Sequence, residues 1–362
     1  MIVRLVRSTM IQDAHMTAYE LNPTSDHRWN AFLRDHPRAS VFHGTSWLKV
    51  LQSSYAYEPI VFTTSPPGQE LKNGLVFCDV KSRLTGRRLV SLPFSDHCEP
   101  LCDSAEEFHF LLQHLQSSLP NKRWKYLEIR PATAGFSQIH GEFAPTAKHF
   151  LHLLNLQPSL EALLRSFDKD SIQRRIQRAD RANLVEVCDS SGRLLNDFYK
   201  LFLITRSRQQ LPPIPRIWFR NLIAHLGSTH EIRVAYLDQK PIAAILALRF
   251  KDIAYYKYGC SDHHFNKFGA MPWLLWRAIA SAKSSGALQF DLGRTEEGNT
   301  GLLAFKNHWV PQPREMLYWN FPVGSVVGPA NSWKVRAAKR IFSLMPHSML
   351  ALSGRLIYPH IG

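Results

Sequence analysis

The sequence has few cysteines and no pattern among them. Five occur in 362 residues, none in CxxC spacing, and a chain of this length needs no covalent staples to hold its core. We therefore expect no disulfide framework and a reducing, cytoplasmic setting. The five are Cys78, Cys98, Cys102, Cys188 and Cys260.

The sequence also lacks a recognisable set of metal ligands. Cys98 and Cys102 lie near His97, but a zinc site needs four spaced ligands and no second pair follows. Ordinary packing of these side chains is the simpler interpretation. We expect no metal.

Long hydrophobic runs are missing. No stretch approaches the roughly 18 uninterrupted apolar residues that span a bilayer. The N-terminal run is interrupted by Arg4 and Arg7 and followed by Asp13, which makes a poor signal peptide. The sequence predicts a cytoplasmic protein that reaches no further than the inner face of the membrane.

Acidic residues are in the minority. The chain has 29 Asp and Glu and 44 Lys and Arg, which gives a net charge of +15. Such a balance favours anionic partners: nucleic acid, phosphorylated metabolites or an acidic membrane face. A solvated basic surface without a partner is the alternative.

The composition is that of a folded chain large enough for two domains. Hydrophobic residues make up 45% and aromatic residues 11%, and 22 prolines are scattered instead of clustered. The length exceeds the usual size of one domain, so each half can bury a core of its own.

The order of predicted elements repeats along the chain. In both halves a pair of helices precedes a meander of three strands, a helix and a final strand. This order predicts an α/β fold of two similar domains, 17–150 and 151–322, each a mostly antiparallel sheet flanked by helices, with a cleft between them. The second-half elements are expected at 193–208, 215–227, 231–238, 241–250, 253–261, 272–286 and 288–293.

Residues 323–362 form a basic, amphipathic tail. Such a helix can lie on an anionic membrane, or it can dock its apolar stripe on the domains, and the sequence leaves both open. The basic residues are Lys334, Arg336, Lys339, Arg340 and Arg355.

The connection that contains Gly269 joins a predicted strand to a predicted helix. Because a helix N-terminus points free amides at a ligand, this is a natural anion site, and a plain turn is the alternative. In element order the segment resembles the one with which acetyltransferases of the GNAT superfamily hold the pyrophosphate of acetyl-CoA. NKFGAM keeps only one glycine of the superfamily's pair. The resemblance implies an acetyl-CoA or acyl-CoA donor, with Gly269 binding it.

Six blocks of sequence carry a closer resemblance. They are RLVSLPFSDHCEPL, SIQRRIQRADRANL, ITRSRQQLPPIP, YYKYGCSD, FDLGRTEEGNTGLLAFKNHW and GRLIYPHIG. Over roughly residues 40 to 320 the chain resembles FemAB-like proteins, which carry a BioF2-like acetyltransferase domain. The last block fits the branch linked to exopolysaccharide and exosortase systems.

This resemblance implies tandem GNAT-like domains and transfer of an acyl or aminoacyl group to an amine of a cell-envelope precursor. Fem members that build peptidoglycan cross-bridges take amino acids from aminoacyl-tRNA, so tRNA is a second class of donor. The coiled-coil arm with which they contact tRNA is not evident here.

Several arginines are candidates for binding phosphate. Arg174, Arg178 and Arg181 project from one side of the helix predicted at 170–184, Arg175 adds to the cluster, and guanidinium groups match phosphate oxygens. A solvated basic face is the alternative. Arg206 and Arg208 close another helix, where the helix dipole also favours a cation.

The block from 290 to 309 places charges directly after a buried strand. Asp291 and Arg294 sit at the strand end, an edge where α/β sheets expose ligand-binding groups, and Lys306 follows on a short helix. We expect Arg294 and Lys306 to contact an anion. Asp291 is either catalytic or bridged to Arg294.

Two further residues are candidates for proton transfer. Asp96 follows a strand in the first domain and is our choice as base for the acceptor amine. The alternative, which is commoner for such residues, is an Asp that only stabilises a turn. Tyr258 stands where GNAT enzymes often hold a tyrosine that protonates the leaving group. A core tyrosine with a satisfied hydroxyl is the alternative.

These features predict direct attack of an amine on a thioester or ester. That reaction needs placed substrates, an acceptor for one proton and donors to the oxyanion, with no bound cofactor. The expected partners are an anionic, phosphate-bearing small molecule or lipid-linked substrate, tRNA, and the membrane through the basic tail. The alternative is a non-catalytic domain pair that binds an anionic saccharide precursor, lipid phosphate or RNA.

Overall fold

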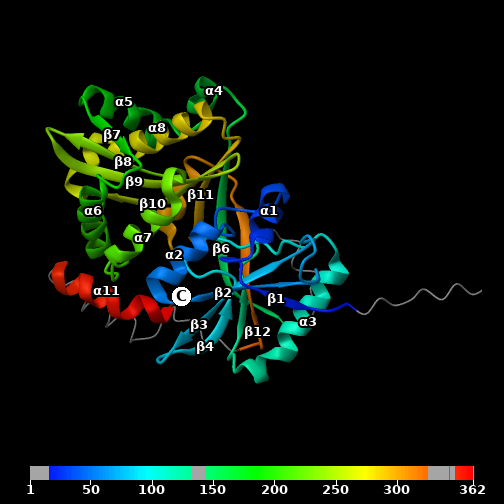
Figure 1. Cartoon of the computed structure of the whole chain (residues 1–362). Helices are drawn as coiled ribbons and strands as arrows, with labels where there is room; N and C mark the ends of the chain where they lie inside the picture. The colour runs from blue at the N-terminus through cyan, green and yellow to red at the C-terminus, as the bar shows by residue number, and fades with distance from the viewer. Residues whose placement is uncertain (1–15, 133–142, 325–341, 343–346, 362) are drawn as a thin grey trace, which may run out of the picture.

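The computed structural model describes residues 16–132, 143–324, 342 and 347–361. Within these residues twelve strands form one continuous sheet, in the order β1-β2-β3-β4-β5-β12-β6-β11-β10-β9-β8-β7 (Figure 1). The α/β class with a mostly antiparallel sheet flanked by helices is therefore confirmed.

The first half supplies one end of the sheet. Its helix α3 begins where the Ser104 side chain accepts a hydrogen bond from the Glu107 amide, a standard N-cap. The elements are β1 (Tyr19–Leu21), α1 (His27–Asp35), α2 (Thr45–Tyr55), β2 (Glu58–Thr63), β3 (Leu75–Ser82), β4 (Gly86–Val90), α3 (Ala105–Lys122) and β5 (Leu127–Ile129).

The second half repeats this order element for element at the other end. Each half runs strand, two helices, three strands, helix, strand, and the sequence predicts this order from the helix pair onward. The elements are β7 (Val185–Asp189), α6 (Leu195–Arg208), α7 (Arg216–Leu226), β8 (His230–Leu237), β9 (Lys240–Phe250), β10 (Ile253–Ser261), α8 (Ala270–Ser284) and β11 (Gln289–Glu296), with the short turns η3 (Gly227–Thr229) and η4 (His263–Phe268).

The two halves share the middle of the sheet. β6 (Ala144–Asn155) pairs with β11 and with β12 (Arg314–Phe321), and β12 pairs in turn with β5. The expected boundary between 150 and 151 thus falls inside β6, and the last strand of the second half lies beside the first half. The division into two domains stays a prediction.

The remaining helices follow β6 or end the chain. The expected single helix at 170–184 is divided: a π-helical turn, η2 (Lys169–Gln173), precedes α5 (Arg174–Arg181). The turn starts where Asp168 accepts a hydrogen bond from the Ser171 amide at 2.6 Å, so a side-chain cap sets a different start. The others are α4 (Leu160–Ser166), α9 (Thr300–Asn307) and α11 (His347–Ile361).

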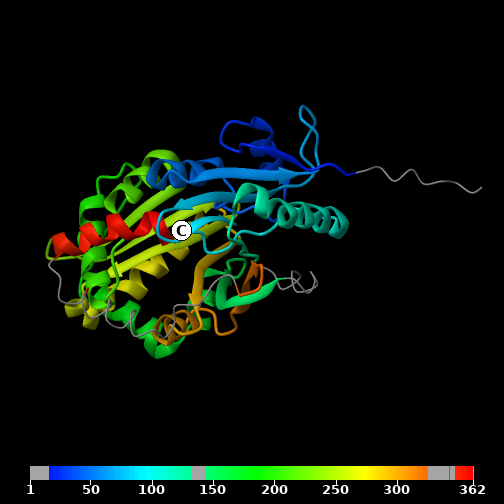
Figure 2. The same cartoon turned by 90° about the horizontal axis from the view of Figure 1, so that it is seen from below.

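Alternate residues of β9 explain why helices cover both faces of the sheet. Ala244, Leu246 and Leu248 pack in one core cluster with α6 and α7, whereas Ile245 and its neighbours pack in another with α8. Side chains on a strand alternate between faces, so a continuous apolar run such as 241–250 is buried on both sides. Figure 2 shows α6 and α8 on opposite faces.

The core under α2 and α7 crosses between the halves. Trp47 on α2 and Trp218 on α7 meet edge to face, with ring centroids 5.4 Å apart, and both are fully buried. Phe42 contacts Tyr255 of β10 in the same cluster. Helices α2 and α7, which are equivalent elements of the two halves, therefore pack against each other on one face of the sheet and hold the halves together.

The basic tail is described in part. α11 docks on the fold: Tyr358 is 7% exposed, and its hydroxyl donates to the carbonyl oxygen of Pro212 at 3.2 Å. Of the tail's basic residues, Arg355 is exposed on α11, and Lys334, Arg336, Lys339 and Arg340 lie outside the described residues. Among the described helices none is long and apolar enough to cross a bilayer.

Candidate active site

Strands β10 and β11 are parallel neighbours for only a short distance. Ile253, Ala254 and Tyr255 pair with Gln289, Phe290 and Asp291, and no pairing between these strands follows. The pairings of β10 with β9 and of β11 with β6 are both irregular just past this point. A parallel sheet that opens in this way exposes backbone and side chains at the strand ends, where ligands commonly bind.

The loop that carries Asp96 reaches this opening from the first half. Leu92 and Phe94 take up left-handed backbone conformations, with φ of 61° and 60°, and the Ser95 hydroxyl donates to the Leu92 carbonyl oxygen at 2.5 Å. Non-glycine residues hold such conformations only where the surroundings enforce them. The turn is further tied down by Tyr318, whose hydroxyl donates to the Asp96 carbonyl oxygen at 2.8 Å.

Asp96 forms an ion pair with Lys257 of β10. The Lys257 ammonium lies 3.0 Å from Asp96 Oδ2 and also donates to the Phe94 carbonyl oxygen at 2.8 Å. Burial acts to raise the pKa of Asp96, but the charges of Lys257 and Arg294 outweigh it and leave that pKa below its usual value. At neutral pH Asp96 is therefore an ionised carboxylate, and its side chain is 18% exposed.

Asp291 is fully engaged by its neighbours. His97 Nε2 lies 3.2 Å from one carboxylate oxygen, and the Gly293 amide donates to the other at 2.6 Å. The residue is 2% exposed. The side chain that Asp291 contacts is thus His97 and not Arg294, and a catalytic role for Asp291 stays a prediction.

Lys306 fixes the bend after Asp291. Its ammonium donates to the carbonyl oxygens of Gly293 and Arg294 at 2.8 and 3.0 Å, and the residue is 3% exposed. Burial lowers the pKa of Lys306 to about 8, against the opposing charges of Asp96 and Asp291. Gly293 has a φ of +75°, a left-handed conformation that favours glycine, and a Cβ there would be in ordinary contact with Asp96 Oδ2 at 3.4 Å.

Arg294 is held beside the same cluster. One of its terminal nitrogens lies 3.1 Å from His149 Nδ1, and its guanidinium stacks over the Tyr318 ring at 5.2 Å. Burial, together with the charge of Arg294, lowers the pKa of His149 to about 3. His149 is therefore neutral and accepts the hydrogen bond from Arg294.

Tyr258 is half-buried and packs against the aromatic core beside the charged cluster. Its hydroxyl accepts a hydrogen bond from Trp218 Nε1 at 3.0 Å, and its ring packs against Phe202 and Phe219. Burial raises its pKa, so the hydroxyl stays protonated. The Lys257 ammonium lies 5.7 Å from the Tyr258 ring, which places the tyrosine next to the cluster.

A second feature is a hollow of about 170 Å³ at the start of α8. Arg175 of α5 and Arg208 of α6 line it, together with Gly269 and Phe305. Gly269 has a φ of +74°, and a Cβ there would clash with the Arg175 carbonyl oxygen, so α5 packs directly on this turn. Phe305 precedes Lys306 on α9, which places the hollow and the charged cluster on two sides of one short helix.

The three arginines expected to bind phosphate have other contacts. Arg174 pairs with Asp170 on its own helical segment and is 60% exposed; Arg178 donates to the Lys267 carbonyl oxygen at 3.1 Å. Arg206 stacks over the Phe202 ring at 5.0 Å. Their role in binding stays a prediction, as does that of every other residue proposed from the sequence.

Sequence reasoning missed Lys257, and it named Arg175 and Arg208 as members of basic clusters without choosing them as site residues. Lys257 stands among aromatic residues in YYKYGCSD, where a lysine in a buried strand is itself unusual. Arg175 and Arg208 lie one and two residues from the arginines that were singled out. A run of arginines on a predicted helix indicates a basic surface. Which of these arginines lines a hollow depends on tertiary packing, which the run does not predict.

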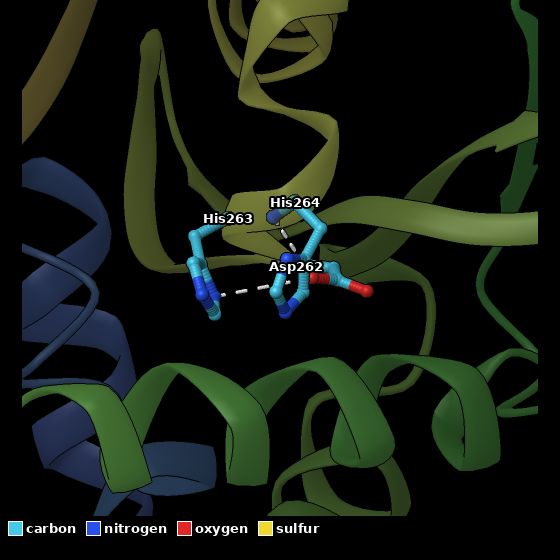
Figure 3. Close-up of side chains that lie close together, drawn as sticks. All are labelled: Asp262, His263 and His264. Carbon is cyan, nitrogen blue, oxygen red and sulfur yellow. Dashed lines mark hydrogen bonds and ion pairs between the residues drawn. The ribbon is translucent and has the colours of Figure 1, made fainter.

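Three neighbouring residues could hold a cation. They are Asp262, which follows β10, and His263 and His264 at the start of η4, and their ligand atoms lie within 4.8 Å of one another (Figure 3). The Asp262 carboxylate already accepts a hydrogen bond from the His264 amide at 3.1 Å, and three ligands are one fewer than a structural zinc site needs. At the other candidate metal site, beside His97, burial raises the pKa of the Cys98 thiol well above its usual value and that of Cys102 to about 12. Both thiols therefore stay protonated, which disfavours their binding a metal as thiolates.

Comparison with known proteins agrees with this architecture. Residues 166–307 match the family model described as an acetyltransferase (GNAT) domain. No curated protein sequence matches the chain.

Solved structures share the fold over most of the chain. FemX is 14% identical with a TM-score of 0.66, and the match covers 85% of this chain and 98% of FemX. L-PGS from Bacillus licheniformis is 14% identical, with a TM-score of 0.52 and coverage of 88% and 97%. A tandem GNAT protein from the clavulanic acid biosynthesis pathway is 10% identical, with a TM-score of 0.51 and coverage of 87% and 99%. The predicted tandem GNAT-like fold is confirmed, as is the likeness of that fold to a Fem protein.

Proposed function

We propose that this protein, which carries a GNAT acetyltransferase domain within the fold of FemX, transfers an acyl or aminoacyl group to an amine of a cell-envelope or exopolysaccharide precursor. The observation that carries the proposal is the meeting of Asp96 with Lys257 at the opening between β10 and β11. It places an ionised carboxylate from one half beside the unpaired strand ends of the other.

The chemistry asks for one proton acceptor. The acceptor amine attacks the carbonyl carbon of a thioester or ester, the carbon–sulfur or carbon–oxygen bond breaks, and the amine proton passes to Asp96. The donor leaves as a thiolate or alkoxide, and the proton held by Asp96 passes to it, which releases a thiol or hydroxyl and restores the Asp96 carboxylate. Lys257 keeps Asp96 ionised and oriented, and Lys306 and Asp291 hold the backbone of residues 291–294 in place.

The donor's phosphates fit the hollow at Gly269. Arg175 and Arg208 supply two guanidinium groups, and the N-terminus of α8 supplies free amides for an anion. Because α9 borders both features, a donor bound there can extend from the hollow toward Asp96. Both acyl-CoA and aminoacyl-tRNA carry phosphates that suit this position.

The acceptor is proposed to be an anionic, phosphate-bearing or lipid-linked precursor at the inner face of the membrane. The net charge of +15 favours it. L-PGS and FemX share the fold, and this supports the choice of an envelope substrate without fixing its identity.

The test is a transfer assay with purified protein. Radiolabelled acetyl-CoA, longer acyl-CoA and aminoacyl-tRNA are each offered with amine-bearing envelope precursors, and product is separated from donor. We expect donor-dependent product with one class of donor, and loss of that product with Asp96→Asn. Tight, salt-sensitive binding of donor or precursor with no product from any donor would instead favour the non-catalytic domain pair.

A further inference from the structure

The outer surface of α11 is apolar although the helix is already docked by its inner surface. Leu350 and Tyr358 face the core, and at Gly354 a Cβ would clash with the Pro213 carbonyl oxygen. These positions are four residues apart and form one face of the helix. A helix docked in this way normally presents polar side chains to water on its other side.

The exposed surface of α11 instead carries four large apolar residues, three on the outer side and Ile361 at the end of the helix. Three of them follow helical spacing, and together they make a stripe beside Arg355. Their exposed fractions are 55% for Met349, 55% for Leu352, 66% for Leu356 and 54% for Ile361.

The turn between β3 and β4 extends this stripe. Leu84 at its tip is 75% exposed, among the most exposed large apolar residues of the described chain. The turn is joined to the end of α11, because the Thr85 hydroxyl donates to the His360 carbonyl oxygen at 3.1 Å and Ser82 Oγ lies 2.9 Å from His360 Nδ1. We call the five residues Leu84, Met349, Leu352, Leu356 and Ile361 the α11 face.

The charged residues of α11 and of the turn between β3 and β4 are basic. Arg83 precedes Leu84 and is exposed, as is Arg355. Burial raises the pKa of Tyr199 while the charges of Arg216 and Arg355 oppose it, which places both arginines near that tyrosine of α6. The charge of Glu58 on β2 is paired with Lys81, which precedes this turn, at 3.0 Å.

The sequence continues the same bias. From residue 316 to residue 362 there is no Asp or Glu, whereas five Lys and Arg occur: Lys334, Arg336, Lys339, Arg340 and Arg355. An apolar stripe edged by cations without acids is the pattern of a helix that lies in the interface of an anionic bilayer.

We propose that the α11 face is a peripheral membrane-binding surface for anionic lipid bilayers. The apolar side chains enter the boundary between headgroups and acyl chains, and Arg83, Arg216 and Arg355 meet the lipid phosphates. A second copy of the chain fits less well, because a two-fold interface would bring the same arginines against each other. Membrane contact does not depend on acyl transfer, so the two can be tested apart.

The experiment is co-sedimentation of the full chain with vesicles. Vesicles of phosphatidylcholine alone are compared with vesicles that also contain phosphatidylglycerol, at low and high salt. We expect binding to the anionic vesicles that weakens as salt rises, and at least about tenfold weaker binding by Leu352→Ser/Leu356→Ser. Arg83→Ala/Arg355→Ala should weaken binding and flatten its dependence on salt.

A matched control is Val185→Ser on β7, the last strand at the opposite end of the sheet from β1, where the valine is 58% exposed. It should bind vesicles as the wild type does. Equal binding by the wild type and Leu352→Ser/Leu356→Ser, or no binding to anionic vesicles, would overturn the proposal. So would a dimer in solution that Leu352→Ser/Leu356→Ser dissociates, because the face would then be an interface between copies.

Discussion

Lys257 and Asp96 form an ion pair that joins the two halves of the protein, with Nζ and Oδ2 3.0 Å apart. The lysine side chain is 4% exposed and the aspartate side chain 18%. A buried charge of this kind is stable only with its partner, so each residue fixes the other. The pair therefore sets both the position and the ionisation of the carboxylate that we propose as the base.

The first prediction concerns the pH dependence of transfer. Lys257→Gln keeps a hydrogen-bond donor but removes the positive charge that most lowers the pKa of Asp96, so that pKa rises. Because the base must be ionised, the acid limb of kcat/KM should move to higher pH. Lys81→Gln, which removes an exposed lysine paired with Glu58, should leave the limb unchanged. An unshifted limb in Lys257→Gln would exclude Asp96 as the titrating base.

The second prediction concerns stability and Lys306. Its pKa is about 8 in the folded state, against 10.5 for a free lysine, so between these values the unfolded state binds more protons. Stability should therefore rise with pH across this window, by on the order of 3 kcal/mol, relative to Lys306→Met. Chemical denaturation of both proteins between pH 7 and pH 10 measures the difference. A difference that does not change with pH would contradict the lowered pKa.

The third prediction concerns Gly269. Gly269→Ala places a Cβ against the Arg175 carbonyl oxygen at a positive φ, so the turn must shift and we expect a cost of about 1–3 kcal/mol. Donor affinity should fall as well, because the hollow is built on this turn. Gly298→Ala is the control, since a Cβ there meets nothing within 4 Å. Thermal denaturation and calorimetric titration with donor are the measurements, and equal behaviour of the two variants would refute the expectation.

The fourth prediction separates neighbouring arginines. Arg175→Ala/Arg208→Ala should weaken binding of the phosphate-bearing donor by roughly tenfold or more and make it less dependent on salt. Arg174→Ala should bind as the wild type does, because that side chain is exposed and pairs with Asp170. Titration at two salt concentrations decides between them. A larger loss from Arg174→Ala would favour the arginines chosen from the sequence.

The repeated architecture could be predicted because its signals are local. The run 241–250 is apolar throughout and forms a strand buried on both faces, and helix α8 has Pro272 near its start. β12 was not predicted, since its partners β5 and β6 are far away in sequence and nothing in its own residues identifies them.

The site was predicted only in its separate parts. Asp96, Asp291, Arg294 and Lys306 stand in unusual charged blocks after apolar strands, which is a local signal. Which charges meet depends on how loop 91–99 reaches β10 across the sheet, and that follows from tertiary packing. The ion pair with Lys257 and the pair of arginines at the hollow therefore became visible only in the structure.

The most direct test of the account is the rate of transfer by Asp96→Asn. The substitution keeps the shape and a hydrogen-bonding oxygen for Lys257 but cannot accept the amine proton, so kcat/KM should fall by about 10²-fold or more while donor affinity is retained. Asp103→Asn, a change at an exposed aspartate paired with Arg38 in the same half, should transfer at the wild-type rate. If Asp96→Asn transfers as fast as Asp103→Asn with the same donor and acceptor, Asp96 is not the base and the opening between β10 and β11 is not the reaction centre.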